Sequence, residues 1–242
     1  MHVVECDQGS AKWFTARCGI PTASNMKNIV TSRGIASTST SRTTYMHTLI
    51  HERLTGNQVD TFCNKAMERG NTLEPIARGF FEMEKGFEVK EVGFCLSDCG
   101  RWGVSPDGLI NADSGIEIKT HPSAHASHIA NLLTGKTPSS FMVQIQACMW
   151  VCERSSWWYV LYTEDEGVPS MILKVERDEK ICDCLAVELP KFCAELDAKE
   201  AAIRARYDLP EREAVDLSQI GGGACPWSEE SEPYDSKGNL KQ

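Results

Sequence analysis

Near the middle of this 242-residue chain stand two motifs separated by six residues, Ser105-Pro106-Asp107-Gly108 and Gly115-Ile116-Glu117-Ile118-Lys119. The second motif alternates apolar and charged side chains, a pattern typical of a β-strand with one buried face. As a strand it would bury Ile116 and Ile118 on one side and project Glu117 and Lys119 together on the other. We therefore expect a carboxylate and an ammonium group to face one site.

The residues before this strand predict a hairpin. Residues 101–105 have the pattern of a short strand that ends at Pro106, because proline cannot donate a hydrogen bond to a β-ladder. Gly108 then gives the chain freedom to turn into a strand at residues 109–110. In this arrangement Asp107 would lie beside Glu117.

Two neighbouring carboxylates and a lysine indicate metal-dependent chemistry. Asp107 and Glu117 would repel each other unless a cation neutralised them, and hard oxygen ligands select Mg²⁺ or Mn²⁺. Lys119 would orient or help to deprotonate an attacking water, or offset the charge of a phosphorane. These residues alone leave a second interpretation open, an exposed hairpin with a cross-strand ion pair worth about 0 to 1 kcal/mol.

A helix is predicted ahead of the hairpin. Ile76, Phe80 and Phe81 have helical spacing, and Asn71 with Glu74 three residues later forms a capping box. Pro75 is acceptable in a first turn, where its missing N–H would have no intrahelical partner. Glu74 therefore has two open interpretations, a helix cap and a metal ligand.

A mostly apolar helix carrying two amides, Gln144 and Gln146, is predicted at residues 141–151. Buried amides need partners, so the two side chains are either satisfied internally or orient the lysine, a water or a phosphate. Residues 157–162 and 171–175 are predicted to pair as strands across a turn at 167–169, and a helix follows at 179–206. This order of elements predicts an α/β or α+β core.

Motifs along most of the chain, from about Trp13 to Ala198, resemble those of phage lambda exonuclease and the related YqaJ-type viral recombinase nucleases. These nucleases belong to the PD-(D/E)xK superfamily. The matching segments are Trp13-x3-Arg17-x-Gly19, Thr22-Ala23-Ser24, Tyr45-x-His47-Thr48-Leu49, Gly70-x3-Glu74, Ser105 to Leu109, Gly115-x-Glu117-x-Lys119, Gln144-x-Gln146-x3-Trp150 and Glu176 to Lys180. The resemblance implies a restriction-endonuclease-like core, with a central mixed β-sheet flanked by helices.

The resemblance also implies roles around a pair of Mg²⁺ ions, for which Mn²⁺ would substitute. Asp107, Glu117 and the backbone carbonyl of Ile118 would hold the catalytic ion, and Glu74 would share a second ion with Asp107. Lys119 would position and activate the water, and Gln144 would hydrogen-bond near it or to the scissile phosphate. Asp98 matches a further acidic position, although the spacing from Asp98 to Asp107 is one residue shorter than in the family.

For the DNA end, the resemblance implies that Arg17 grips a terminal 5′-phosphate, a task suited to a planar guanidinium. Ser24 matches a hydroxyl of the same pocket, with a helix N-cap as the alternative. Trp13 would pack near the duplex end. Met67 occupies the position of an apolar wedge against the terminal base pair, with core filling as the alternative.

Composition limits these expectations. A net charge of −9 opposes nonspecific adhesion to DNA, so binding would need a local basic channel. Eleven cysteines without a Cys-x2-Cys motif or a visible secretory signal predict reduced thiols and no zinc or iron–sulfur site. No apolar run could span a membrane. The basic-channel candidates are Arg17, Lys27, Arg33, Arg42, Lys119 and Lys136.

Two segments fall outside the predicted core. Residues 31–42 are polar and of low complexity, which predicts a mobile loop. Residues 208–242 are rich in proline, glycine and acidic residues, which predicts a loosely ordered tail after a nuclease domain at 1–207.

Together these observations predict a Mg²⁺-dependent, alkaline-type 5′→3′ exonuclease. It would digest one strand of linear duplex DNA from a 5′-phosphorylated end and expose a 3′ strand for recombination. The resemblance adds a homotrimeric ring around DNA, a single-strand annealing protein as partner, and a location in the cytoplasm of a bacterial host. The alternatives are another PD-(D/E)xK nuclease, an endonuclease or a 3′→5′ exonuclease, and a DNA-end-binding recombination factor without catalysis.

Overall fold

The computed structural model describes residues 1–59, 65–120, 125–211 and 222–223, and no side chains for residues 65–71, 125 and 222–223. Its main sheet has four strands in the order β4-β5-β6-β7. β5 and β6 are parallel and the other two pairs are antiparallel, so the sheet is mixed. The strands are β4 Gly108–Ile110, β5 Ser114–Thr120, β6 Ser156–Tyr162 and β7 Met171–Glu176.

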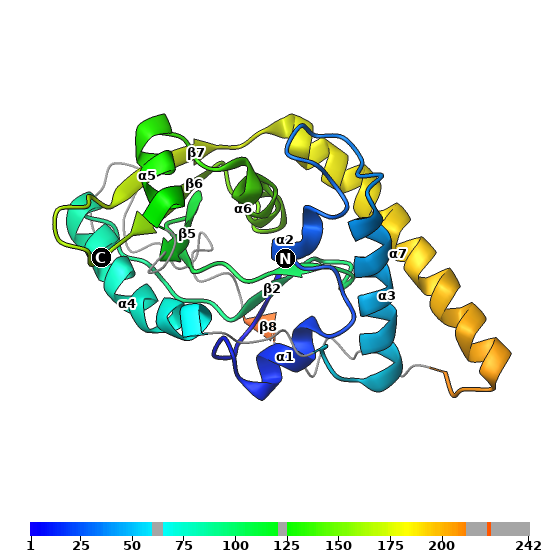
Figure 1. Ribbon diagram of the computed structural model, residues 1–242. Helices are drawn as coiled ribbons and strands as arrows, with labels where there is room; N and C mark the ends of the chain where they lie inside the picture. The colour runs from blue at the N-terminus through cyan, green and yellow to red at the C-terminus, as the bar shows by residue number, and fades with distance from the viewer. Residues whose placement is uncertain (60–64, 121–124, 212–221, 224–242) are drawn as a thin grey trace.

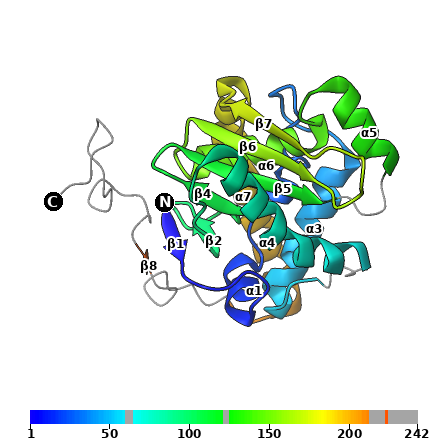
Figure 2. The ribbon, with the colours of Figure 1, turned by 90° about the vertical axis from the view of Figure 1, so that its left-hand side faces the viewer.

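Helices cover both faces of this sheet, as Figures 1 and 2 show. On one face Ile116 and Ile118 of β5 pack with Phe81 of helix α4 (Lys65–Lys85). On the other face Trp157 and Tyr159 of β6 pack with residues of helix α6 (Ser139–Val151). The expected alternation along residues 116–119 is confirmed, with both isoleucines on the α4 side. The connection from β5 to β6 runs through α5 (His125–Thr134) and α6.

A second sheet, in the order β3-β2-β1-β8, stands beside the first. Its strands are β1 His2–Val4, β2 Phe94–Leu96, β3 Gly103–Val104 and β8 Gly222–Gly223. The predicted hairpin between residues 101–105 and 109–110 is therefore wrong, because β3 pairs with β2 whereas β4 pairs with β5. The chain crosses from the second sheet to the main sheet at Ser105-Pro106-Asp107. Pro106 has no N–H to donate, so the ladder between β3 and β2 ends before it.

Four further helices complete the architecture. Helices α1 Ala11–Arg17 and α2 Ala23–Met26 lie near the N-terminus, and α3 Thr40–Thr55 runs beside α7 Glu179–Tyr207 (Figure 1). The guanidinium of Arg53 joins α3 to α7 through Asp197 at 2.8 Å and Glu200 at 3.1 Å. The predicted final helix and both predicted core strands of β6 and β7 are confirmed.

The predicted capping box at Asn71 is wrong, because α4 begins at Lys65 and continues through Asn71. The stretch from 65 to 69 is Lys-Ala-Met-Glu-Arg, all good helix formers, which extend the helix upstream. Pro75 therefore stands inside the helix, on its exposed side. Glu74 is left without a capping role.

The predicted loop at 31–42 is shorter and better held than expected. Thr31 N–H donates to Ile35 at 2.9 Å and Ser37 N–H donates to Ile29 at 2.8 Å, so a backbone-bonded turn replaces a free loop. Helix α3 takes in residues 40–42. Of the predicted tail, residues 208–211 and strand β8 are described, and the rest lies outside the described residues. None of the helices in the described part of the chain is both long and apolar enough to cross a membrane.

The close packing of β5 against β6 generates a stability prediction. A Cβ added at Gly115 would lie 2.3 Å from the fully buried Trp157 ring, so Gly115→Ala overpacks the core. We expect a loss of about 1 to 3 kcal/mol in the free energy of unfolding, measured by chemical denaturation. Gly79→Ala on α4 is the control, since its Cβ meets nothing within 4 Å, and we expect it to be neutral or stabilising. Equal stability of Gly115→Ala and wild type would contradict this packing.

Candidate active site

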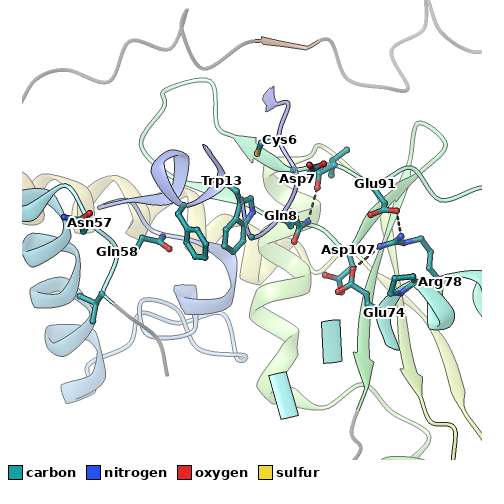
Figure 3. Close-up of a pocket in the computed structure, with 16 residues that line it drawn as sticks. Cys6, Asp7, Gln8, Trp13, Asn57, Gln58, Glu74, Arg78, Glu91 and Asp107 are labelled. Atoms are coloured by element: carbon teal, nitrogen blue, oxygen red, sulfur yellow. Dashed lines mark hydrogen bonds and ion pairs between the residues drawn. The ribbon is translucent and has the colours of Figure 1, made fainter. Parts of the chain in front are cut away.

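A groove of about 1050 Å³ runs along one side of the molecule (Figure 3). Asn57 and Gln58, which follow α3, lie at one end, and Trp13 of α1 lies in the middle. Glu74 and Asp107 lie at the other end. The groove thus connects residues of α1 and α4 with the loops that follow β1 and α3 and the loops that precede β2 and β4.

Three carboxylates from three parts of the chain lie near enough at the acidic end to influence one another's charge. Glu74 projects from α4, Asp107 precedes β4, and Glu117 stands on β5. Asp107 is fixed by its Oδ2 atom, which accepts a 2.6 Å hydrogen bond from the Ile118 backbone N–H. Glu74 and Asp107 line the groove, whereas Glu117 is fully buried behind them. The sequence prediction that Asp107 lies beside the β5 motif is confirmed, although by a crossing between sheets and not by the predicted hairpin.

Glu117 is held by the lysine and by one of the two glutamines. Its Oε1 atom forms an ion pair with Lys119 and accepts a 2.6 Å hydrogen bond from Gln144 Nε2. Its Oε2 atom is buried and has no hydrogen-bond partner among the described residues. A buried carboxylate oxygen without a partner is costly, unless a ligand completes it.

Burial and mutual repulsion raise the proton affinity of these acids. Burial, and then the charge of Asp107, raises the pKa of Glu74 to about 7. Burial likewise raises the pKa of Glu117 to about 7 against the opposing effect of Lys119, and burial raises the pKa of Asp107. Burial alone would lower the pKa of Lys119, but Glu117 and Asp107 raise it overall. The site therefore favours added positive charge.

The donor set fits a hard divalent cation. All side-chain donors are carboxylate oxygens, the ligands that Mg²⁺ and Mn²⁺ prefer, and Glu117 Oε2 is available. Within the described ranges, no three His, Cys, Asp or Glu side chains converge on a complete metal site. Asp107 and Glu117 would hold such an ion together with the Ile118 carbonyl and water.

Arg78 is a site residue that the sequence analysis missed. One turn after Glu74 on α4, it forms a 3.0 Å ion pair with Glu74 and a second ion pair with Glu91. The side chain lines the groove and is 9% exposed. The i,i+4 spacing from Glu74 was a sequence signal for this pair.

The predicted phosphate-binding residues Arg17 and Trp13 lie together on α1. Ser10 caps this helix by accepting the Trp13 N–H, and the guanidinium carbon of Arg17 lies 3.9 Å from the Trp13 ring. Arg17 Nη1 and Trp13 Nε1 both donate to Ser105 Oγ, at 2.8 and 2.9 Å. Burial lowers the pKa of Arg17 to about 10, and its buried Nε has no partner among the described residues. This N–H can donate a hydrogen bond to an anion.

Gln8 was also missed, and no sequence pattern indicated it. Its amide nitrogen donates to the carbonyl of Pro106 at 2.8 Å and to that of Val92 at 2.9 Å. Because Pro106 directly precedes Asp107, Gln8 helps to fix the backbone that carries this carboxylate. Ser105, quoted in the motif without a role, fixes the same segment from the Arg17 side.

The two glutamines of α6 have different roles. Gln146 is fully buried; it donates to the Glu176 carbonyl at 3.0 Å and accepts from the Asp178 N–H at 2.8 Å. It therefore joins α6 to the start of α7. Of the two roles considered for this amide, the structure shows the internal one, in which its hydrogen bonds are made within the protein. Gln144 instead contacts Glu117.

Other predicted site residues do not join the carboxylates. Asp98, 72% exposed, pairs with the N-terminal amine at 2.7 Å and with His2. Arg42 pairs with Glu195 of α7 at 2.8 Å and lies over Phe192, so packing already engages this cation.

Arg33 and Ser24 are exposed. Ser24 is not a helix cap, because Thr22 occupies the N-cap of α2. Met67 belongs to α4, but its side chain lies outside the described residues, so the predicted wedge stays a prediction.

The chain is similar to proteins of known family and known structure. A family model for the YqaJ-like viral recombinase domain matches residues 12–155, more than half of the chain. Two crystal structures of the alkaline exonuclease LHK-Exo from Laribacter hongkongensis are similar, one of them in complex with dAMP. Each is 33% identical with a TM-score of 0.74, over 82% of this chain and 98% of the exonuclease chain. No curated protein matches the sequence.

A phage-related exonuclease from Haemophilus somnus 129PT is similar in fold alone, at 13% identity. Its TM-score is 0.58, over 76% of this chain and 96% of that one. The predicted PD-(D/E)xK core, a mixed sheet flanked by helices, is confirmed.

The raised carboxylate pKa values generate a prediction about metal binding. Between about pH 4.5 and 7 the folded, metal-free protein retains protons that the unfolded chain has lost, so these acids reduce stability as the pH rises. A divalent cation such as Mg²⁺ would bind the ionised forms. We expect Mg²⁺ to raise the melting temperature by at least about 2 °C at pH 8 and by less at pH 6, in thermal denaturation. In Glu117→Gln the Mg²⁺ effect should disappear; an equal Mg²⁺ effect in both proteins would contradict this site.

Proposed function

Because the chain belongs to the YqaJ-like viral recombinase family, we propose that it is a Mg²⁺-dependent 5′→3′ exonuclease acting on linear double-stranded DNA. It would digest one strand from a 5′-phosphorylated end and leave a 3′ single strand for recombination. One observation carries the proposal: the buried Glu117, with an unpartnered oxygen and its ion pair to Lys119, lies behind Asp107 at the end of a groove.

Each residue at the acidic end has a task in phosphodiester hydrolysis. A bound Mg²⁺ would polarise the phosphate and lower the pKa of a water. Asp107 and Glu117 would hold the catalytic ion with the Ile118 carbonyl, and Glu74 would share a second ion with Asp107. The ion pair with Glu117 holds the Lys119 ammonium beside the proposed metal ligands. We therefore assign Lys119 to positioning and activating the water and to stabilising negative charge.

The position of Arg17 supports the proposed polarity. Its guanidinium is bound to Ser105, two residues before Asp107, so a phosphate held by Arg17 would lie at a defined separation from the carboxylates. A terminal 5′-phosphate fits this pocket, because the buried Nε offers an unused donor in a fixed plane. Trp13 packs against the guanidinium, and Ser24 would contribute a hydroxyl to phosphate binding. A free end of duplex DNA would thereby be recognised through its 5′ strand.

Family membership motivates the remaining proposals. We propose a homotrimeric ring around DNA, a single-strand annealing protein that receives the 3′ strand, and action in the cytoplasm of a bacterial host. The competing functions are an endonuclease or 3′→5′ exonuclease with the same metal site, and a DNA-end-binding factor without catalysis.

Strand-specific digestion tests the proposed function. Linear duplexes with a 5′-phosphate or a 5′-hydroxyl, labelled internally on each strand, should lose only the strand with the 5′-phosphate, and only with Mg²⁺ present. Arg17→Ala should reduce the preference for the phosphorylated end by about tenfold or more, because a charge-assisted bond is lost. Cleavage of a closed circle, or loss of strands from their 3′ ends, would replace this function with one of the competing nucleases.

Removal of the lysine tests the assigned chemistry. We expect Lys119→Ala to lower the cleavage rate by about 100-fold or more while Mg²⁺-dependent DNA binding is largely kept, measured by single-turnover cleavage and by anisotropy. Lys174→Ala, at a 48% exposed position of β7, is the matched control and should cleave at the wild-type rate. Near-normal cleavage by Lys119→Ala would disprove the assigned mechanism.

A further inference from the structure

Building on the proposed function, we propose that Phe14 and Gln58 form a binding site for the nucleobase of the 5′-terminal nucleotide. The site lies in the groove on the far side of Arg17 and Trp13 from the carboxylates. Phe14 would stack on the base and Gln58 would hydrogen-bond to its edge. The site would accept any of the four bases.

Among the described residues that line the groove, Phe14 is the aromatic residue whose ring faces are open to stacking by a ligand. It lines the groove and is 45% exposed, so part of its ring can contact a ligand. The neighbouring Trp13 is already engaged, because Arg17 covers its ring at 3.9 Å and Ser105 accepts its indole N–H. The Phe14 ring meets Trp13 edge to face, with centroids 5.0 Å apart and planes at 77°. Trp13 thus fixes the orientation of Phe14.

The opposite wall is formed by residues that follow α3. Gln58 and Val59 line the same groove, and Val59 is 40% exposed. The side-chain amide of Gln58 forms no hydrogen bond with the described residues, whereas Asn57 bonds to Thr55. An amide can both donate and accept, so one rotatable group can serve the edges of different bases. Figure 3 shows Gln58 between Asn57 and Trp13, away from Glu74 and Asp107.

A buried carboxylate sets the spacing between this wall and the arginine. Glu52 of α3, 7% exposed, accepts the Val59 N–H at 3.2 Å with Oε1 and the Gly19 N–H at 2.9 Å with Oε2. Gly19 follows Arg17 by two residues, and Arg53 Nε donates to its carbonyl at 2.7 Å. The wall of the groove and the end of α1 are therefore held by one side chain. Because Glu52 holds the end of α1 and the residues after α3 at a fixed distance, one nucleotide could place its phosphate at Arg17 and its base beside Phe14.

The chemistry at this end of the groove is that of base binding without sequence selection. Stacking on an aromatic ring tolerates every base, because each has a π-face. An exonuclease that removes nucleotides in succession needs such tolerance. The phosphate would be held at Arg17 and the base beside Phe14, which is next to Trp13 in the chain and in space.

The test compares the affinities of two duplex ends with Ca²⁺ in place of Mg²⁺, so that a divalent cation is present while cleavage is suppressed. Both carry a 5′-phosphate; one has a normal terminal nucleotide and the other an abasic one. In anisotropy titrations we expect wild type to prefer the end with a base by about 10- to 100-fold, and Phe14→Ala to lose this preference. Phe14→Tyr should keep it, and Gln58→Ala should reduce it about two- to tenfold. Tyr207→Ala, at a 65% exposed tyrosine on α7 outside the groove, is the control and should keep it.

Two results would overturn the site. The first is an equal preference for the base in Phe14→Ala and in wild type, or no preference in wild type. The second is a changed oligomeric state of Phe14→Ala in size-exclusion chromatography, which would make Phe14 a subunit contact. The measurement is independent of the proposed function, since it needs no cleavage. Base-dependent binding that Phe14→Ala loses, in a protein that fails to digest DNA with Mg²⁺, would refute the exonuclease and leave the base site in place.

Discussion

A carboxylate withdrawn from water determines the arrangement of the whole candidate site. Glu117 stands on an inner strand of the main sheet, beneath α6, where an unpaired charge is strongly unfavourable. Lys119 and Gln144 offset this cost, but both act on the same oxygen. The second oxygen stays without a partner, and Asp107 adds further negative charge beside it. The burial that makes this position costly for folding is also what makes it suited to a divalent cation.

The crossing between the two sheets connects Arg17 to the carboxylates. Ser105, Pro106 and Asp107 form this crossing, and each is held by a different partner. Ser105 receives hydrogen bonds from α1, Pro106 receives one from Gln8, and Asp107 receives one from the β5 backbone. Because consecutive residues carry these contacts, Arg17 and Asp107 keep a fixed separation. The net charge of −9 is compatible with this site, since the charge that matters to DNA is local.

Residues close together in the sequence allowed the correct predictions. The alternation of residues 116–119 placed Glu117 and Lys119 on one face, because strand geometry has a period of two residues. The strands at 157–162 and 171–175 and the helix after residue 179 followed from local patterns in the same way. Local patterns also misled: the capping box at Asn71 was overridden by helix-forming residues upstream, and Pro106 ended a strand of a different sheet from the one expected.

Local sequence was enough to predict the mixed α+β core and to indicate the residues of the acidic end, since a strand or helix pattern acts over a few neighbouring positions. The partners of those residues depend on the tertiary structure. It separated Gln144, which holds Glu117, from Gln146, which joins two helices, and it engaged Arg42 with α7. It also brought Gln8 to Pro106 across 98 positions of the chain. Such contacts depend on how sheets and helices pack, and packing joins residues whose separation in sequence carries no periodic signal.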